Sequence, residues 1–271
     1  MKNVKFKPIY ALIIAMCVVM LLFEWLPSLK ELPITKDEAY NRLISRSIPL
    51  LFGGLAVYLI SVECGIKLFK KPQKLWCLAI AGVVALNNFP WLAWFSGKMH
   101  LIHTQPLHFV LLGLYCLLVG FFEEVLFRGV FFGLLAGVFE RTHKGLLFTY
   151  LISSFAFGAI HLLNVFQSGG AAVLQAGYSI LTGGLFAFVW IKTKNILFPA
   201  LIHAVYNFCG LLYTKDVGLG LGSVIDLPTG VMMAVIAVIC GVFVLISVWK
   251  YPNNEQIELY DRLGLKKVEK V

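Results

Sequence analysis

Charged residues are scarce in this chain of 271 residues. They make up 14% of it, against about 25% in an average soluble domain, while 59% of the residues are hydrophobic. With a mean hydropathy of +0.84, this composition excludes an ordinary soluble domain, a disordered chain, a coiled coil and collagen. The apolar runs are too long for strands, so we predict an all-α, polytopic membrane protein.

Paired cysteines are also absent. None of the six cysteines stands in a CxxC pair, and most lie in apolar stretches, which argues against a disulfide framework. Acidic residues are outnumbered, since 23 Lys and Arg stand against 14 Asp and Glu. In a soluble protein this excess would suggest a nucleic-acid partner, but between apolar runs it reports membrane orientation. We therefore expect the lipid bilayer, and no nucleic acid, as a partner.

The apolar runs divide into about eight transmembrane helices, most of them near the ~20 residues that a span needs. Starting with the N-terminus inside, 16 Lys and Arg fall on the inner side and 6 on the outer side. This bias predicts a multi-pass integral membrane protein with both termini in the cytoplasm. The segments are Ile9–Leu26, Ile48–Leu68, Leu75–Phe95, Pro106–Arg128, Leu146–Leu163, Gly170–Ile191, Ile196–Tyr213 and Gly230–Trp249.

The sequence predicts irregular helix at two places within these segments. The apolar run 106–139 would reach about 51 Å as one helix, against a hydrocarbon core of about 30 Å. We therefore expect a break or strong tilt near Gly129. Asn87, Asn88 and Pro90 interrupt the third segment, where we expect a kink whose freed backbone groups are satisfied by the two amides.

Three ionisable residues stand inside the fourth segment: Glu123, Glu124 and Arg128. At membrane depth each costs about 2.5–3.5 kcal/mol, so they should be paired or face a cavity. Glu124 and Arg128 are four residues apart with the acid first, the order that favours an ion pair. Glu123 lies about 100° round the helix and is left free, as a general base would be. Alternatively, all three lie wetted at the cytoplasmic end of the span and snorkel to water.

Two histidines also interrupt apolar segments. Phe157 precedes His161 by one helical turn, and Asn207 follows His203 by one turn. Such histidines can donate to an oxyanion, shuttle a proton or bind a metal, and Asn207 can hold His203 or supply a further donor. Asn164 either supports the His161 ring or caps the helix.

The remaining histidines have simpler interpretations. His100, His103 and His143 fall in loops, where no function is expected. His108 stands near the outer end of the fourth segment and is expected at the membrane interface.

Three motifs follow one another on three apolar segments: Glu-Glu-x-x-x-Arg at 123–128, Phe-x-x-x-His at 157–161 and His-x-x-x-Asn at 203–207. In this order they closely resemble the CPBP family. That family comprises the type II CAAX prenyl endopeptidases and the Abi proteins of bacteriocin processing or immunity. The resemblance covers about residues 106–213. We therefore divide the chain into N-terminal helices (1–105), a catalytic core (106–213), an outer loop with the last span (214–250) and a cytoplasmic tail (251–271).

The resemblance implies an intramembrane endopeptidase whose helices surround a catalytic cavity reached from the cytoplasm. In it, Glu123 would activate water, which His161 would help to hold. His203 and Asn207 would polarise the scissile carbonyl and stabilise its oxyanion. The implied catalytic residues are Glu123, Glu124, Arg128, His161, His203 and Asn207, with Phe157 and Asn164 supporting them.

The sequence leaves open whether this site binds a metal. The chain has no His-Glu-x-x-His motif, but Glu123, His161 and His203 could form a zinc site with two histidines and one carboxylate. As a ligand, Glu123 would no longer be free as a base. We therefore favour a site without a cofactor, with zinc as the alternative.

The substrate is expected to be a membrane-associated peptide or protein: a prenylated CAAX-type peptide, an apolar leader peptide or a peptide pheromone. Two other functions remain open. The chain could be a catalytically idle scaffold or bacteriocin-immunity protein that binds a peptide or partner, or a transporter that couples protons through Glu123. An inverted repeat, which many transporters carry, is not evident in the sequence.

Overall fold

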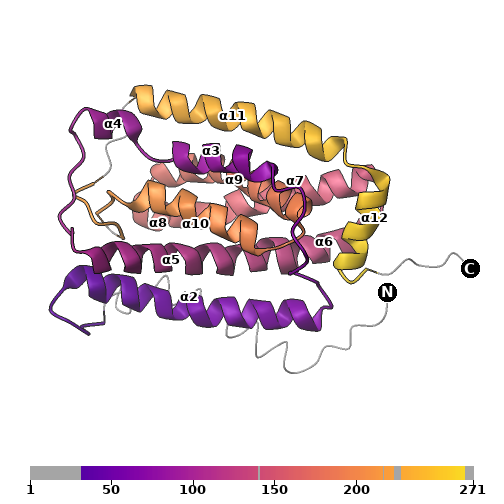
Figure 1. Cartoon of the computed structure of the whole chain (residues 1–271), viewed down its shortest axis with the longest axis horizontal. Helices are drawn as coiled ribbons and strands as arrows, with labels where there is room; N and C mark the ends of the chain where they lie inside the picture. Colours follow the sequence, from indigo (N-terminus) through magenta and orange to yellow (C-terminus); the bar gives the residue numbers. More distant parts are fainter. Residues whose placement is uncertain (1–31, 140, 216, 223–226, 266–271) are drawn as a thin grey trace, which may run out of the picture.

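The computed structural model describes residues 32–139, 141–215, 217–222 and 227–265. All regular elements in this part are helical (Figure 1). They are α2 (Glu38–Glu63), α3 (Cys77–Asn87), α4 (Trp91–Phe95), α5 (Pro106–Glu124), the π-helical segment η2 (Val125–Phe131), α6 (Phe132–Val138), α7 (His143–Ile160), the 3-10 segment η3 (His161–Asn164), α8 (Val165–Ser168), α9 (Ala171–Thr193), α10 (Leu197–Leu211), α11 (Leu227–Trp249) and α12 (Asn253–Arg262).

The described helices confirm an all-α integral membrane protein. Five helical stretches are long and apolar enough to cross a bilayer, and α3 and α10 are shorter apolar helices. Many large apolar side chains on their outer faces are exposed, as expected where lipid replaces water. The five stretches are Glu38–Glu63, Pro106–Val138, His143–Asn164, Ala172–Thr193 and Gly230–Trp249.

The predicted spans differ from these helices in three places. The second begins earlier, at Glu38, because Asp37 caps the helix by accepting the N–H groups of Ala39 and Tyr40. The third is divided into α3 and α4, and the seventh is the 15-residue α10, which is short for a full crossing. The first predicted span, Ile9–Leu26, lies outside the described residues.

The helices that carry the three motifs are linked by direct packing and through α9. α5 packs against α2 on one side and against α10 on the other, while α7 packs on α9 (Figure 1). α10 also contacts α3 and α9, so it is enclosed by neighbours. α11 lies over α9 and α3 and is mostly exposed. The site residues on α5 and α10 are therefore held between other helices.

α5 and α10 approach each other at a glycine. A Cβ on Gly120 would lie 2.5 Å from the carbonyl oxygen of Ala200 and 3.2 Å from the nitrogen of Ala204. These residues flank His203, and Gly120 precedes Glu124 by one turn. The close crossing of the two backbones therefore brings His203 to the two glutamates.

The strong tilt that we gave as the alternative to a break near Gly129 stays a prediction, because the helix that begins at Pro106 continues without a break. It changes at Val125 from α to π geometry and continues as α-helix to Val138. A π-helical turn adds a residue to the turn without interrupting the hydrogen-bonded ladder, and such turns are frequent at functional sites. Glu124 and Arg128 lie on either side of this change.

The predicted kink near Pro90 is confirmed, but the two amides act differently from our expectation. Asn88 donates its side-chain N–H to the carbonyl of Tyr206 on α10 at 2.8 Å, and Asn87 donates to the carbonyl of Met233 on α11 at 3.5 Å. The amides therefore tie the interrupted segment to two other helices.

Residues 251–265, the described part of the predicted tail, pack on the helical bundle. They include the helix α12, in which Leu259, Tyr260 and Arg262 are almost fully buried. The Arg262 guanidinium lies 4.4 Å from the centre of the Trp190 ring on α9. Glu258 pairs with Lys70 and Lys194, which fastens the helix to the loops before α3 and after α9. The predicted cytoplasmic location of this segment stays a prediction.

Candidate active site

The three motifs meet inside the bundle. Glu123 and Glu124 end α5, His161 begins η3 directly after α7, and His203 and Asn207 lie one turn apart on α10. His203 makes a direct polar contact with Glu124 and faces Glu123 at a longer distance. Phe157 links His161 to His203, because its ring centre lies 5.1 Å from that of His161 and 5.8 Å from that of His203.

The predicted ion pair between Glu124 and Arg128 is confirmed. Arg128 Nε lies 3.1 Å from Glu124 Oε2, and both side chains are 0% exposed. The burial excludes the alternative in which these two residues snorkel to water. Arg128 also donates from Nη2 to the carbonyl of Gly183 on α9 at 2.7 Å.

Aromatic rings surround the remaining surface of Arg128. Its guanidinium carbon lies 4.4 Å from the centre of the Phe157 ring, 5.7 Å from that of Phe186 and 5.9 Å from that of Phe127. The negative faces of aromatic rings attract a desolvated cation. Phe157, predicted as a supporting residue, is therefore packed between the buried cation and the two histidines.

His203 lies between the two glutamates. Its Nδ1 is 2.9 Å from Glu124 Oε1, and its Nε2 is 3.8 Å from Glu123 Oε2. Because Glu124 is paired with Arg128 as a carboxylate, it accepts the Nδ1–H of His203. Phe186 stacks on the imidazole with ring centres 4.6 Å apart and planes 19° apart. The ring is thus held in one orientation, with Nε2 directed toward Glu123.

Glu123 is the partly accessible carboxylate of the pair. Its side chain is 23% exposed, whereas that of Glu124 is not exposed. Oε2 of Glu123 is shielded from solvent and makes no hydrogen bond to any described residue. The distance of 3.8 Å to His203 exceeds a direct hydrogen bond, and a small polar group could bridge the two atoms.

His161 has a defined tautomer. Its Nδ1 lies 2.7 Å from the carbonyl oxygen of Phe157, which can only accept, so Nδ1 carries the proton. In the neutral ring, Nε2 is then left as an acceptor. Asn164 donates its amide N–H to Gln175 on α9 at 2.8 Å, which ties η3 to that helix.

Asn207 completes the third motif. It lies one turn beyond His203 on α10 and is half-buried. Its amide makes no hydrogen bond to another residue in the described part of the chain, so its donors are free for a ligand.

The alternative zinc ligands do not converge. Among the described residues, the group of three ligand atoms close enough to hold a metal is formed by Asp37, His103 and His108, not by Glu123, His161 and His203. The Nδ1 bonds of His203 to Glu124 and of His161 to a carbonyl leave Nε2 of each ring as the available ligand atom. In this arrangement the ligand atoms of Glu123, His161 and His203 lie too far apart to share one ion.

Two residues of the site were missed in the sequence. Phe186 stacks on His203, and the Gly183 carbonyl binds Arg128. A Cβ on Gly183 would lie 2.9 Å from the Phe157 ring, so the glycine allows that ring to pack closely. The pair Gly183-Gly184 inside an apolar span is a signal of close approach. The stacking of Phe186 has no equivalent signal, since phenylalanine is common in such spans.

A hollow of about 430 Å³ lies elsewhere, next to α12. It is lined by residues such as Arg141, Gln256 and Tyr260, and it shares no lining residue with the cluster around Glu123.

Comparison with known families matches residues 105–209 to the type II CAAX prenyl endopeptidase Rce1-like family. The matched region runs from the residue before α5 into α10 and includes all three motifs. Neither the curated proteins nor the solved structures gave a significant match to the chain. This match confirms the resemblance to the CPBP family that the three motifs indicate.

Proposed function

We propose that this protein is an intramembrane endopeptidase in which Glu123 activates the water that cleaves a membrane-associated peptide. One observation carries the proposal: the two adjacent glutamates have different surroundings. Glu124 is held by Arg128 and His203, while Glu123 keeps an unbonded oxygen that faces His203 Nε2 at 3.8 Å. A general base needs such an available carboxylate within reach of water.

The reaction begins with a water bound between Glu123 and the neighbouring imidazoles. Glu123 takes a proton from this water, and the water oxygen attacks the scissile carbonyl carbon. The protonated Glu123 then gives the proton to the leaving amine, so one carboxylate acts first as base and then as acid. His161, whose Nε2 is an acceptor, helps to orient the water.

The negative charge that develops on the carbonyl oxygen is stabilised by donors from α10. As the imidazolium, His203 keeps Nδ1–H on Glu124 and offers Nε2–H to the oxyanion. Asn207 adds an amide N–H from the next turn. Donors held in place before the reaction lower the barrier because they need no reorganisation. The Glu124–Arg128 pair contributes by fixing the orientation of His203.

Zinc is not required by this scheme. The test is the activity of the purified protein after treatment with a chelator that strips a control zinc protease. Retained cleavage supports the metal-free mechanism. Activity that disappears with the metal and returns when zinc is restored would make Glu123, His161 and His203 the ligands.

The substrate is an apolar or lipid-modified peptide, because the site lies among membrane helices and next to aromatic rings. The informative experiment compares membrane peptides in cells carrying the wild type with those in cells carrying Glu123→Ala. Peptides cut only by the wild type identify both the activity and the substrate. Synthetic versions of these peptides, with and without a prenyl group, then show whether cleavage requires the lipid. Identical peptide profiles in the two strains would instead favour the idle scaffold or immunity protein.

A further inference from the structure

A second cluster of polar side chains lies at the opposite end of α5 from the candidate active site. Asp37, His103 and His108 each offer one ligand atom, and these atoms all lie within 4.8 Å of one another. His108 is separated from Glu124 by 16 residues of helix, or about 24 Å. The cluster is therefore distinct from the catalytic one, and we propose that it binds a divalent transition metal, with zinc as the best fit.

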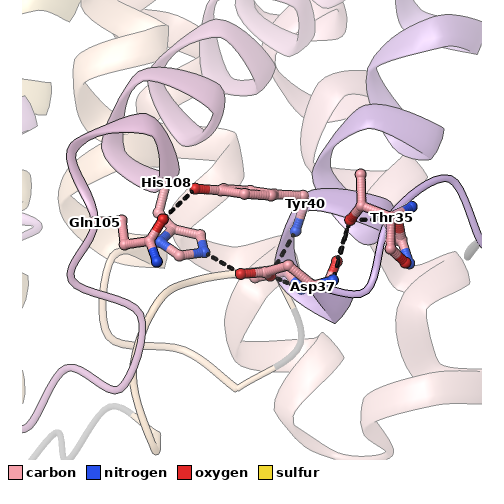
Figure 2. Close-up of polar contacts among 7 residues, drawn as sticks. Thr35, Asp37, Tyr40, Gln105 and His108 are labelled. Carbon is pink, nitrogen blue, oxygen red and sulfur yellow. Dashed lines mark hydrogen bonds and ion pairs between the residues drawn. The ribbon is translucent and has the colours of Figure 1, made fainter.

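Asp37 presents one carboxylate oxygen to the cluster. Oδ1 accepts the backbone N–H groups of Ala39 and Tyr40 at the start of α2, at 2.9 and 3.1 Å. Oδ2 is left to face His108 Nε2 at 3.0 Å (Figure 2). The helix cap thus fixes the carboxylate and directs its second oxygen outward.

His108 is only 2% exposed, so at its predicted position near the membrane interface it is covered by protein. The Tyr40 ring packs on it with centres 4.3 Å apart, and the Tyr40 hydroxyl donates to Gln105 Oε1 at 2.8 Å (Figure 2). One ring nitrogen faces Asp37, and the other, Nδ1, is buried without a hydrogen bond to any described residue. Either nitrogen of His108 is therefore available as a ligand atom.

His103 comes from the loop before α5. Its backbone N–H and that of Ile102 donate to the carbonyl of Leu219, at 3.2 and 2.8 Å, which holds the loop against a distant segment. The His103 ring centre lies 5.0 Å from that of His108. A half-buried loop histidine beside a fixed one can adjust its ring to a common ligand.

Two imidazoles and one carboxylate favour a transition metal. Imidazole nitrogen suits zinc and its neighbours, whereas calcium and magnesium prefer oxygen ligands. Bonds of about 2.0 Å in a tetrahedral zinc site separate the ligand atoms by about 3.3 Å, close to the 3.0 Å between Asp37 and His108. Water completes the fourth position. The metal would join the start of α2 to the start of α5 and the loop before it.

The test is zinc binding to the full chain in detergent, purified with a tag that contains no histidine. After chelation, the wild type should take up about one equivalent of Zn²⁺ in a titration, and Zn²⁺ should raise its Tm. Asp37→Asn should lose this equivalent while keeping the helix cap, since asparagine is also a good N-cap residue. His103→Ala should lose it as well. His100→Ala, an exposed histidine of the same loop, is the matched control and should bind as the wild type does.

Three outcomes would overturn the site. They are no stoichiometric zinc in the wild type, an equivalent that remains in folded Asp37→Asn, and an equivalent that His203→Ala removes while Asp37→Asn keeps it. Uptake of Mg²⁺ or Ca²⁺ in preference to Zn²⁺ would also contradict it. Because Glu123→Gln leaves this cluster untouched, zinc binding and peptide cleavage can fail independently.

Discussion

His203 Nδ1 lies 2.9 Å from Oε1 of Glu124, on a carboxylate that also pairs with the fully buried Arg128. This contact assigns the two adjacent glutamates to different tasks, because it occupies Glu124 and turns the other nitrogen of His203 toward Glu123.

Glu123→Gln keeps the shape of the side chain but removes the base. Cleavage should fall at least ~100-fold, the lower end for general-base catalysis, while the amount of protein in the membrane stays unchanged. The measurement is turnover of a synthetic peptide by equal amounts of purified protein. Glu38→Gln, an exposed residue far along the chain, is the control. Normal cleavage by Glu123→Gln would mean that another group is the base.

Glu124→Gln should affect folding as well as activity. It leaves the Arg128 guanidinium buried without its carboxylate, and breaking a buried pair in this way costs about 3–5 kcal/mol. We expect less protein in the membrane and a lower Tm than for Glu123→Gln. If the two variants are equally stable, the ion pair has no structural role.

Asn207→Ala should slow turnover without weakening substrate binding. Removal of one oxyanion donor typically lowers kcat about 10²–10³-fold, because the donor acts mainly in the transition state. Steady-state kinetics separate the two effects. A rise in KM at constant kcat would identify Asn207 as a substrate-binding residue instead.

Gly120→Ala should separate α5 from α10. The added Cβ would lie 2.5 Å from the Ala200 carbonyl oxygen, and overpacking of this kind costs about 1–3 kcal/mol. Both Tm and cleavage should fall, since His203 moves with α10. Gly113→Ala on the same helix is the matched control, because its Cβ meets nothing within 4 Å. Equal behaviour of the two variants would argue against the close crossing.

Membrane orientation is checked by labelling single cysteines introduced into loops. The excess of Lys and Arg predicts that the loop Lys67–Lys74 and the C-terminal tail are labelled from the cytoplasm, and the loop Thr214–Thr229 from outside. Labelling of the two termini from opposite sides would contradict an even number of crossings.

Composition and residue spacing were sufficient to predict the membrane class, the helical fold and the pairing of Glu124 with Arg128. Long apolar runs permit few structures other than helices in a bilayer, and four-residue spacing places Glu124 beside Arg128 whatever surrounds them. The order of the three motifs was sufficient to indicate the family whose model matches residues 105–209.

Only the tertiary structure decided which groups meet across helices. The contact of His203 with Glu124 depends on a crossing at Gly120, and the pairing of Asp37 with His108 joins residues 71 positions apart. Helical periodicity gives the face on which a side chain lies but not the neighbour that this face will meet. The burial of α12 was missed for the same reason, since its charged residues find partners on Lys70 and Lys194, far away in the chain.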